Sequence, residues 1–400
     1  MTKAENDVVI TGIGIVSSLG VGRQAHLSVL TTGDTVEPVL DTESFAPYPV
    51  HPLPEINWSD QIPRRGDQRQ MENWQRIGVF TAGLALDDAG LKEDLEACST
   101  MDMVVAAGGG ERDISVDTMI VNEAAKRNDR DMVLNEKLTT ELRPTLFLAQ
   151  LSNLLAGNIS IVHKVTGSSR TFMGEESAGI SAVATLFERI RAGQTSHALV
   201  GGAYNAQRPD MHLVYEGMQT LEQGAWRPLW ERSGDTGGIV TGSASAFLVM
   251  ESRAHAEARG ATIHARIDAV EGDRGKRDEG RMERRLERMA DIIKAPDSPD
   301  TLVMSGASGA HDLTEREKAF LESHYGSGLL RGYSGVIGHS MEAQFPIGIA
   351  LAATALGSQG RFGRFDPVSE GVMAKAARRA VVTSVGFYHG EGLAGLAADL

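Results

Sequence analysis

Short apolar runs, most of them bordered by glycine or serine, recur along the chain and predict buried β-strands. The runs are 8–15 (VVITGIGI), 103–107 (MVVAA), 197–200 (HALV), 245–251 (SAFLVME) and 380–385 (AVVTSV). Such strands, apolar on both faces, are typical of sheets covered on both sides. Between them, apolar residues recur at helical spacing in 73–90, 178–193, 252–259, 282–293 and 346–356. Strands alternating with helices predict a layered α/β fold.

Two adjacent glutamates stand at the start of one of these helices, in the stretch 170–183 (RTFMGEESAGISAV). Small residues surround Glu175 and Glu176, and Ile180, Val183 and Leu186 follow at helical spacing. A turn that leads into a buried helix fits this pattern better than a solvated surface does. The role of the acidic pair therefore depends on what surrounds the turn.

Composition and charge narrow the class of protein. The chain has 400 residues, 42% of them apolar, which is enough for one large core or two fused cores. A formal net charge of −14 argues against general binding of nucleic acid or anionic membranes. No apolar run reaches the length of a membrane span, and the N-terminus lacks the apolar core of a signal peptide.

Cysteine usage points to a reducing compartment. Cys98 is the only cysteine, which excludes an internal disulfide framework and a cysteine-based metal cluster. We interpret Cys98 as an inert buried thiol, predict no metal site and expect a cytoplasmic protein. The segment 271–288 is dense in both charge signs. It favours a solvated helix with pairs of opposite charge four residues apart, and the alternative is a docking surface for an acidic partner.

Six features in the same order resemble the β-ketoacyl-acyl carrier protein synthases of the thiolase superfamily, over nearly the whole chain. They are 8–20 (VVITGIGIVSSLG), 75–91 (QRIGVFTAGLALDDAGL), 197–203 (HALVGGA), 226–251 (beginning WRPLWERSG), 337–340 (IGHS) and 384–387 (SVGF). The resemblance implies a thiolase-like five-layer αβαβα fold made of two related halves, which we place at 1–252 and 253–400. It also implies a dimer, either a homodimer or a heterodimer.

The family reaction is a decarboxylative Claisen condensation between an acyl thioester on cysteine and a malonyl group on an acyl carrier protein. The resemblance implies no cofactor bound by the chain itself, because the substrates are carried on the phosphopantetheine of that carrier. The chemistry needs a thiolate at a helix N-terminus, two histidines, a lysine, and backbone N–H groups around the acyl oxygen.

The sequence departs from the family at three of the four catalytic side chains. By ungapped alignment Glu176 takes the nucleophile position, Ser305 the first histidine position and Ser334 the lysine position. His339 is the retained histidine, and Phe387 is retained at the oxyanion and gate position. His311 and His389 stand nearby in the sequence, and we interpret His311 as a surface or loop-capping residue.

A carboxylate is a poor acyl acceptor, because the product would be a mixed anhydride that lies uphill from a thioester. Our hypothesis is that Glu176 folds into the oxyanion pocket. There it would accept hydrogen bonds from its own N–H, the Phe387 N–H and His339. One alternative is that Glu176 only caps the helix and contacts water, and another is that it acts as a general base in a decarboxylase.

These residues favour a chain-length-factor-like partner of an active synthase in fatty-acid or polyketide biosynthesis, deficient in condensation itself. The alternative is an active 3-oxoacyl-acyl carrier protein synthase or malonyl-acyl carrier protein decarboxylase with an atypical site using Glu176 and His339. A scaffold without an acyl-chain role is a third possibility. An acidic carrier protein would need basic residues, either Arg64, Arg65, Arg69 and Arg76 or the stretch 274–288.

Overall fold

Ten strands form two groups with the same order in space. The structure, a computed structural model, describes residues 4–232, 237–278, 280–326 and 328–399. The first group runs β4-β3-β5-β6-β1 and the second runs β9-β8-β10-β11-β7. The first comprises β1 (Val8–Ser17), β3 (Asp102–Ala107), β4 (Ser169–Met173), β5 (His197–Tyr204) and β6 (Ala244–Ser252). The second comprises β7 (Ala265–Asp273), β8 (Thr301–Ser305), β9 (Leu329–Gly332), β10 (Arg379–Val385) and β11 (Glu391–Ala397).

Strand direction repeats as well as strand order. In each group three strands are parallel and the last two pair antiparallel. The groups join where residues 8–10 of β1 pair with residues 265–267 of β7, and the short β2 (Gly20–Val21) pairs with the other end of β1. The chain is therefore built of two topologically equivalent halves, and the division at residues 252 and 253 stays a prediction.

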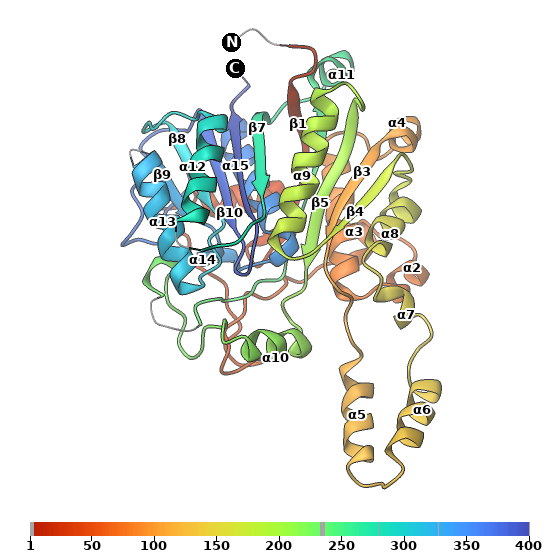
Figure 1. Cartoon of the computed structure of the whole chain (residues 1–400). Helices are drawn as coiled ribbons and strands as arrows, with labels where there is room; N and C mark the ends of the chain where they lie inside the picture. Colours follow the sequence, from red (N-terminus) through yellow and green to blue (C-terminus); the bar gives the residue numbers. More distant parts are fainter. Residues whose placement is uncertain (1–3, 233–236, 279, 327, 400) are drawn as a thin grey trace.

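Helices form the remaining layers (Figure 1). The outer face of the first half packs against α3 (Asn73–Asp88) and α8 (Leu154–His163). The outer face of the second packs against α12 (Arg281–Ile293) and α13 (His311–Tyr325). Between the halves lie α9 (Glu176–Arg191) and α15 (Gln344–Ser358), in contact with each other and with strands of both. This arrangement confirms the thiolase-like five-layer fold.

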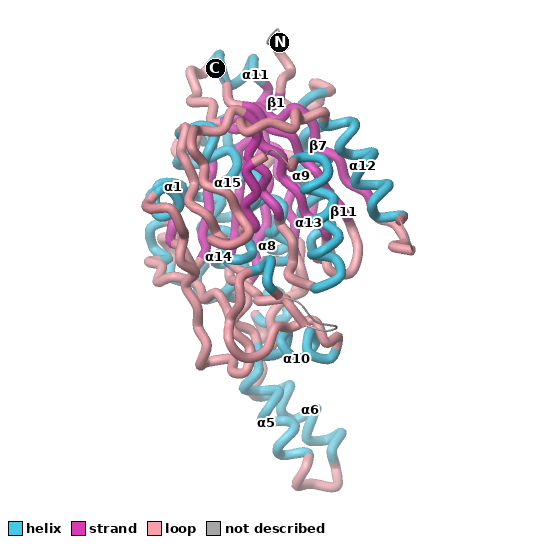
Figure 2. Tube along the Cα trace, turned by 90° about the vertical axis from the view of Figure 1, so that its left-hand side faces the viewer, coloured by secondary structure: helices cyan, strands magenta, loops and turns pink. Residues whose placement is uncertain are grey.

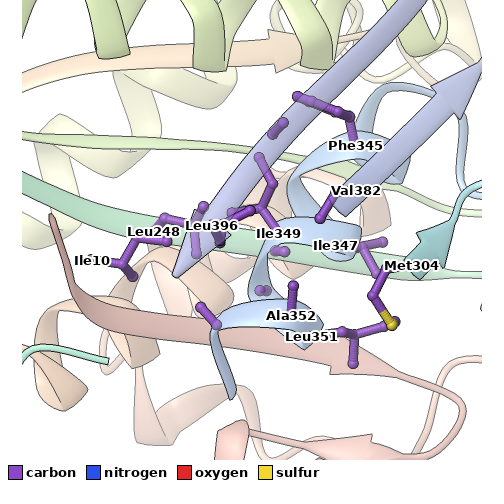
Figure 3. Packing of buried hydrophobic residues seen from close by; sticks show 14 of the residues in the cluster. Ile10, Leu248, Met304, Phe345, Ile347, Ile349, Leu351, Ala352, Val382 and Leu396 are labelled. Atoms are coloured by element: carbon purple, nitrogen blue, oxygen red, sulfur yellow. The ribbon is translucent and has the colours of Figure 1, made fainter. Parts of the chain in front are cut away.

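The central layer explains why α15 is apolar on every side. Its residues 344–356 are all buried, because strands of both halves cover it. Figure 3 shows Phe345, Ile347 and Ile349 of α15 among side chains from strands of both halves. Along a strand, alternate side chains point to opposite faces of the sheet and pack against different helix layers. Val104 packs towards α9, whereas Val105 packs towards α3.

The remaining helices connect and flank this frame. They are α1 (Arg23–Thr31), α2 (Arg65–Gln70), α4 (Leu95–Thr100), α5 (Ile114–Ala124), α6 (Arg130–Thr140), α7 (Leu146–Ala149), α10 (Pro209–Gly217), α11 (Arg253–Ala258) and α14 (Ser334–Ile337). The hairpin of α5 and α6 projects from the body in both views (Figures 1 and 2). In the described ranges, no helix combines the length and apolar character needed to cross a bilayer.

The structure corrects the interpretation of the charged segment 271–288 as one solvated helix. Residues 271–273 belong to β7, and α12 begins only at Arg281. Two arginines of the segment 271–288 point inward. Arg277 Nε and Arg285 Nε each donate a 2.8 Å hydrogen bond to the carboxylate of Glu391, which is fully buried. Part of the charge in this segment therefore stabilises the second half from within.

Candidate functional site

The turn between β4 and α9 places Glu176 at the first residue of α9. Gly174 has a φ of 134°, a conformation that L side chains rarely adopt, and Glu175 is the residue before the helix. Glu176 has an exposed fraction of 0%. A carboxylate at a helix N-terminus is stabilised by the helix dipole, which offsets part of the cost of burial.

Two groups donate hydrogen bonds to the same carboxylate oxygen of Glu176. The main-chain N–H of Phe387 lies 3.0 Å from Oε1, and His339 Nε2 lies 2.6 Å from it. The contacts expected with Phe387 and His339 are therefore present, and the alternative in which Glu176 only contacts water is wrong. The bond expected from the N–H of Glu176 itself stays a prediction.

His339 is positioned by a glycine-dependent loop. Its N–H donates a 2.8 Å hydrogen bond to the Val240 carbonyl, and its carbonyl accepts one from Gly242 N at 3.0 Å. Gly338 has a φ of 77°, and a Cβ there would lie 2.6 Å from Gly242 Cα. Only glycine fits both the conformation and the close approach, so the IGHS motif specifies the loop that presents the histidine.

Phe387 covers the site after β10. Its main chain supplies the hydrogen bond to Glu176, and its ring packs edge-to-face on Tyr215 of α10 at 5.7 Å between centroids. Tyr388 is exposed and His389 is half-buried beside it. Phe387 thus contacts the buried carboxylate through its main chain and α10 through its ring.

Ser305 ends β8 and belongs to a separate polar cluster. Its hydroxyl donates a 2.7 Å hydrogen bond to Glu317 Oε1 on α13, and Thr383 on β10 donates another at 2.5 Å. Burial raises the pKa of the Glu317 carboxyl, while these two hydrogen bonds lower it. A serine in this position supplies no imidazole to a substrate.

Ser334 is the first residue of α14, and its hydroxyl is hydrogen-bonded to a neighbouring side-chain amide. Gln344 Nε2 donates a 2.7 Å hydrogen bond to its hydroxyl, and Gln344 Oε1 accepts one from the N–H of Ser340 at 2.8 Å. Gln344 thus links the predicted lysine position to the loop that carries His339. These hydrogen bonds hold the loop in place but bring no positive charge to the site.

A second buried carboxyl group, which the sequence interpretation missed, lies close to the first. Glu342 follows His339 by three residues and has an exposed fraction of 7%. Burial raises its pKa to about 8, and the charges of Glu175 and Glu176 act in the same direction. The sequence feature that could have revealed Glu342 is an acidic residue inside the apolar run 341–350 (MEAQFPIGIA). Glu317 was missed too, although it follows Leu313 and precedes Leu321 by one helical turn each.

The remaining predicted residues lie outside this cluster. Cys98 is fully buried, its thiol donates a hydrogen bond to the Leu91 carbonyl at 3.3 Å, and burial raises its pKa. An inert buried thiol fits these facts. His311 begins α13, and its side chain lies outside the described residues. Within the described ranges, no group of His, Cys, Asp or Glu side chains is arranged to hold a metal ion.

Chemically, the site offers a fully buried carboxylate and imidazole, with one backbone donor directed at the carboxylate. Glu176 brings no sulfur to the predicted nucleophile position, and the two serines are bonded to neighbouring groups. The fold and this site define a thiolase-like protein in which a buried carboxylate opens the central helix of the first half.

Comparison with known proteins identifies the family. Residues 5–256 match the model of the β-ketoacyl synthase N-terminal domain. The match covers more than half of the chain, which therefore belongs to the β-ketoacyl synthase family.

Relatives come from fatty-acid and polyketide biosynthesis. A 3-oxoacyl-[acyl-carrier-protein] synthase 2 of Rhizobium meliloti (strain 1021) is 26% identical over 287 residues, covering 65% of this chain and 62% of the relative. The chain thus spans slightly under two thirds of that relative's length. The oxytetracycline polyketide putative beta-ketoacyl synthase 1 of Streptomyces rimosus is 25% identical, covering 86% of this chain and 84% of the relative.

Solved structures share the fold over almost the full length. The ishigamide ketosynthase/chain length factor has a TM-score of 0.79 at 22% identity, covering 99% of this chain and 100% of that one. A type II PKS ketosynthase, solved with its acyl-carrier protein and bound to the hexaketide, has a TM-score of 0.72 at 16% identity, covering 98% and 99%. At these identities the similarity establishes the fold alone.

Proposed function

We propose that this chain is a condensation-deficient subunit that pairs with an active ketosynthase and shapes the acyl chain that its partner builds. The observation that supports it most directly is the buried Glu176 carboxylate, bonded to the Phe387 N–H and His339 where a thiol would act. A carboxylate held there blocks the oxyanion pocket and cannot retain an acyl group as a thioester.

The edge strand β4 and the projecting hairpin are the surfaces that we propose for the partner. β4 pairs only with β3 in the described sheet, so its other edge is available to another chain. Large apolar side chains are exposed on or beside both elements: Met173 of β4 is 69% exposed, Met132 of α6 is 67% exposed, and Phe147 of α7, which follows the hairpin in the sequence, is 69% exposed. Exposed apolar side chains on an open strand edge are typical of a protein interface.

The test of this function is co-expression with a ketosynthase that retains the cysteine, both histidines and the lysine. We expect the two chains to copurify, and we expect condensation of acyl and malonyl groups on an acyl carrier protein only when both are present. Condensation by this chain alone would contradict the proposal. Decarboxylation of malonyl carrier protein by the isolated chain, lost in Glu176→Ala, would instead support the decarboxylase alternative.

Met173→Asp is expected to weaken association with the partner by about tenfold or more, because a charge at the strand edge would be desolvated on pairing. The matched control is Val368→Asp, which alters an apolar side chain that is 77% exposed in the second half. Affinity is measured by analytical ultracentrifugation of the pair. Equal weakening by both variants would show that β4 is not the contact.

Docking of an acidic carrier protein is expected at α2 rather than at α12. Arg64, Arg65 and Arg69 are exposed and form no ion pair with any described residue. The triple change to glutamate is expected to weaken carrier binding at least tenfold at low salt and leave folding unchanged.

Arg285→Glu provides the contrast, because Arg285 binds the buried Glu391. This change is expected to lower the free energy of unfolding by about 3–5 kcal/mol, since it leaves a buried carboxylate without one of its partners. Carrier binding is measured by calorimetry and stability by urea unfolding. If the folded Arg285→Glu variant bound the carrier more weakly while the α2 triple variant bound it normally, carrier docking would be assigned to α12 and not to α2.

A further inference from the structure

A small cavity with both polar and apolar walls lies at the base of the α5–α6 hairpin, next to the site of Glu176. It has a volume of about 30 Å³ and is bounded by Trp74 of α3, Gly108 after β3, Tyr204 of β5, Tyr215 of α10, and Glu342. A cavity of this size holds about two groups the size of a water molecule. It is therefore too small for an alkyl chain but large enough for one or two oxygen atoms.

Two hydrogen-bond donors on the cavity wall have no partner of good geometry among the described residues. They are the indole N–H of Trp74, which is 3% exposed, and the hydroxyl of Tyr204, which is 5% exposed. Buried donors of this kind are nearly always satisfied in folded proteins, by protein, water or ligand. An apolar occupant would leave both unsatisfied, whereas an oxygen acceptor would satisfy them.

Glu342 is held in the cavity by backbone geometry. Its carboxyl group accepts a hydrogen bond from the main chain of Glu342 itself. A Cβ on Gly108 would clash with its Oε1, and the main-chain carbonyl of Glu342 packs closely on Gly179, one turn after Glu176. Glycine at both positions is therefore what lets this side chain reach the cavity.

Neighbouring polar groups fix the walls. Arg208 Nη2 donates hydrogen bonds to the Gly110 carbonyl at 2.8 Å and to Asp210 at 2.7 Å. The Glu111 carboxylate accepts hydrogen bonds from Trp74 N and Asn205 Nδ2, both at 2.9 Å. These groups already have partners. The Tyr204 oxygen accepts from Tyr215, and the Glu342 carboxyl group accepts from its own main chain. The indole N–H of Trp74, the O–H of Tyr204 and the second oxygen of Glu342 remain to recognise an occupant. The cavity is thus pre-formed.

We propose that this cavity is a subsite for an oxygen-bearing group of the acyl chain, a ketone or a hydroxyl, and that Glu342 determines this preference. The proposal rests on the function proposed above, because it requires a chain built at the paired site to reach the hairpin base. It specifies the substrate class: chains that keep their oxygens after condensation, rather than fully reduced alkyl chains.

The test compares two probes that differ at one carbon, acetoacetyl-pantetheine and butyryl-pantetheine, by calorimetry on the purified full-length chain. We expect the ketone probe to bind at least tenfold more tightly, since only it carries a carbonyl oxygen at C3 that can accept hydrogen bonds from Trp74 and Tyr204. Glu342→Leu is expected to abolish this preference, and Glu342→Gln, which keeps size and hydrogen bonding, is expected to retain it.

Glu370→Gln is the matched control. Glu370 is also a buried carboxyl group, but it bonds to Gly332 N and Phe365 N and does not line the cavity. This variant should keep the tenfold preference. A crystal structure of the acetoacetyl complex should place the ketone oxygen within hydrogen-bond distance of Trp74 Nε1 or the Tyr204 hydroxyl.

Equal affinity for the two probes, or a crystal structure with only ordered water in the cavity, would overturn the proposal. Failure of the chain to copurify with a ketosynthase is a separate result. Probe binding is measured on this chain alone, so a ketone preference without copurification would refute the partner function and leave the subsite intact.

Discussion

Glu342→Gln is expected to raise the free energy of unfolding above pH 5, by an amount that grows to roughly 3–5 kcal/mol near pH 8. The carboxyl group has a pKa of about 8 in the fold against an ordinary value of 4.5. Below pH 4.5 both states are protonated and the stability that depends on this group is fully present. Between pH 4.5 and 8 only the unfolded chain loses the proton, so stability falls by about 1.4 kcal/mol per pH unit.

The glutamine variant cannot ionise and lacks this dependence. Urea unfolding of both proteins between pH 4 and 9 gives the difference directly, which cancels the contributions of other buried groups. Glu175, Glu176 and Arg208 face Glu342 and are unchanged in both proteins. A difference that stays constant across this range would mean that the Glu342 carboxyl group has the same pKa in the folded and unfolded states, and burial would then not control it.

Glu176→Cys is expected to create an acyl acceptor where the natural chain has none. Wild-type protein incubated with an acyl-carrier thioester should show no mass shift, because a carboxylate does not hold an acyl group stably. The variant should gain one acyl group per chain, since a thiol at the start of α9 would be activated by the helix N-terminus. Intact-protein mass spectrometry measures both.

Condensation by Glu176→Cys alone should still fall short of an active synthase by about 10³-fold or more, because Ser305 and Ser334 supply neither imidazole nor ammonium. Glu175→Cys is the matched control, with a thiol one residue earlier and away from the Phe387 N–H. It should acylate more slowly. A stable acyl adduct on the wild-type chain would contradict the proposed loss of condensation.

Much of the fold was predictable because apolar periodicity reports burial directly. The runs at 8–15, 103–107 and 380–385 are strands, and the helical patterns at 73–90 and 178–193 are helices. β11 was missed, since its sequence EGLAGLA contains few β-branched residues and draws its strand conformation from pairing with β10 and β7. The α5–α6 hairpin was also missed, because its apolar residues do not all face the core.

Part of the site was predictable from motif position. Alignment placed Glu176, His339 and Phe387 in one site, and backbone donors at a helix start suggested how a carboxylate could be held. Glu317 and Glu342 were not predicted, because a single acidic residue within an apolar pattern does not reveal whether it turns outward. The burial of Glu391 could not be predicted from the sequence either. Its two arginines lie 114 and 106 residues away in sequence, beyond any local pattern.

The hydrogen bond between Glu176 and His339 connects residues from the two topological halves, one on α9 and the other on the loop before α15. It lies where the paired central helices begin, so it acts as a mechanical link across the internal duplication. His339 therefore contributes to the rigidity of the fold whether or not it takes part in turnover. The presence of this histidine in the chain does not by itself testify to catalysis.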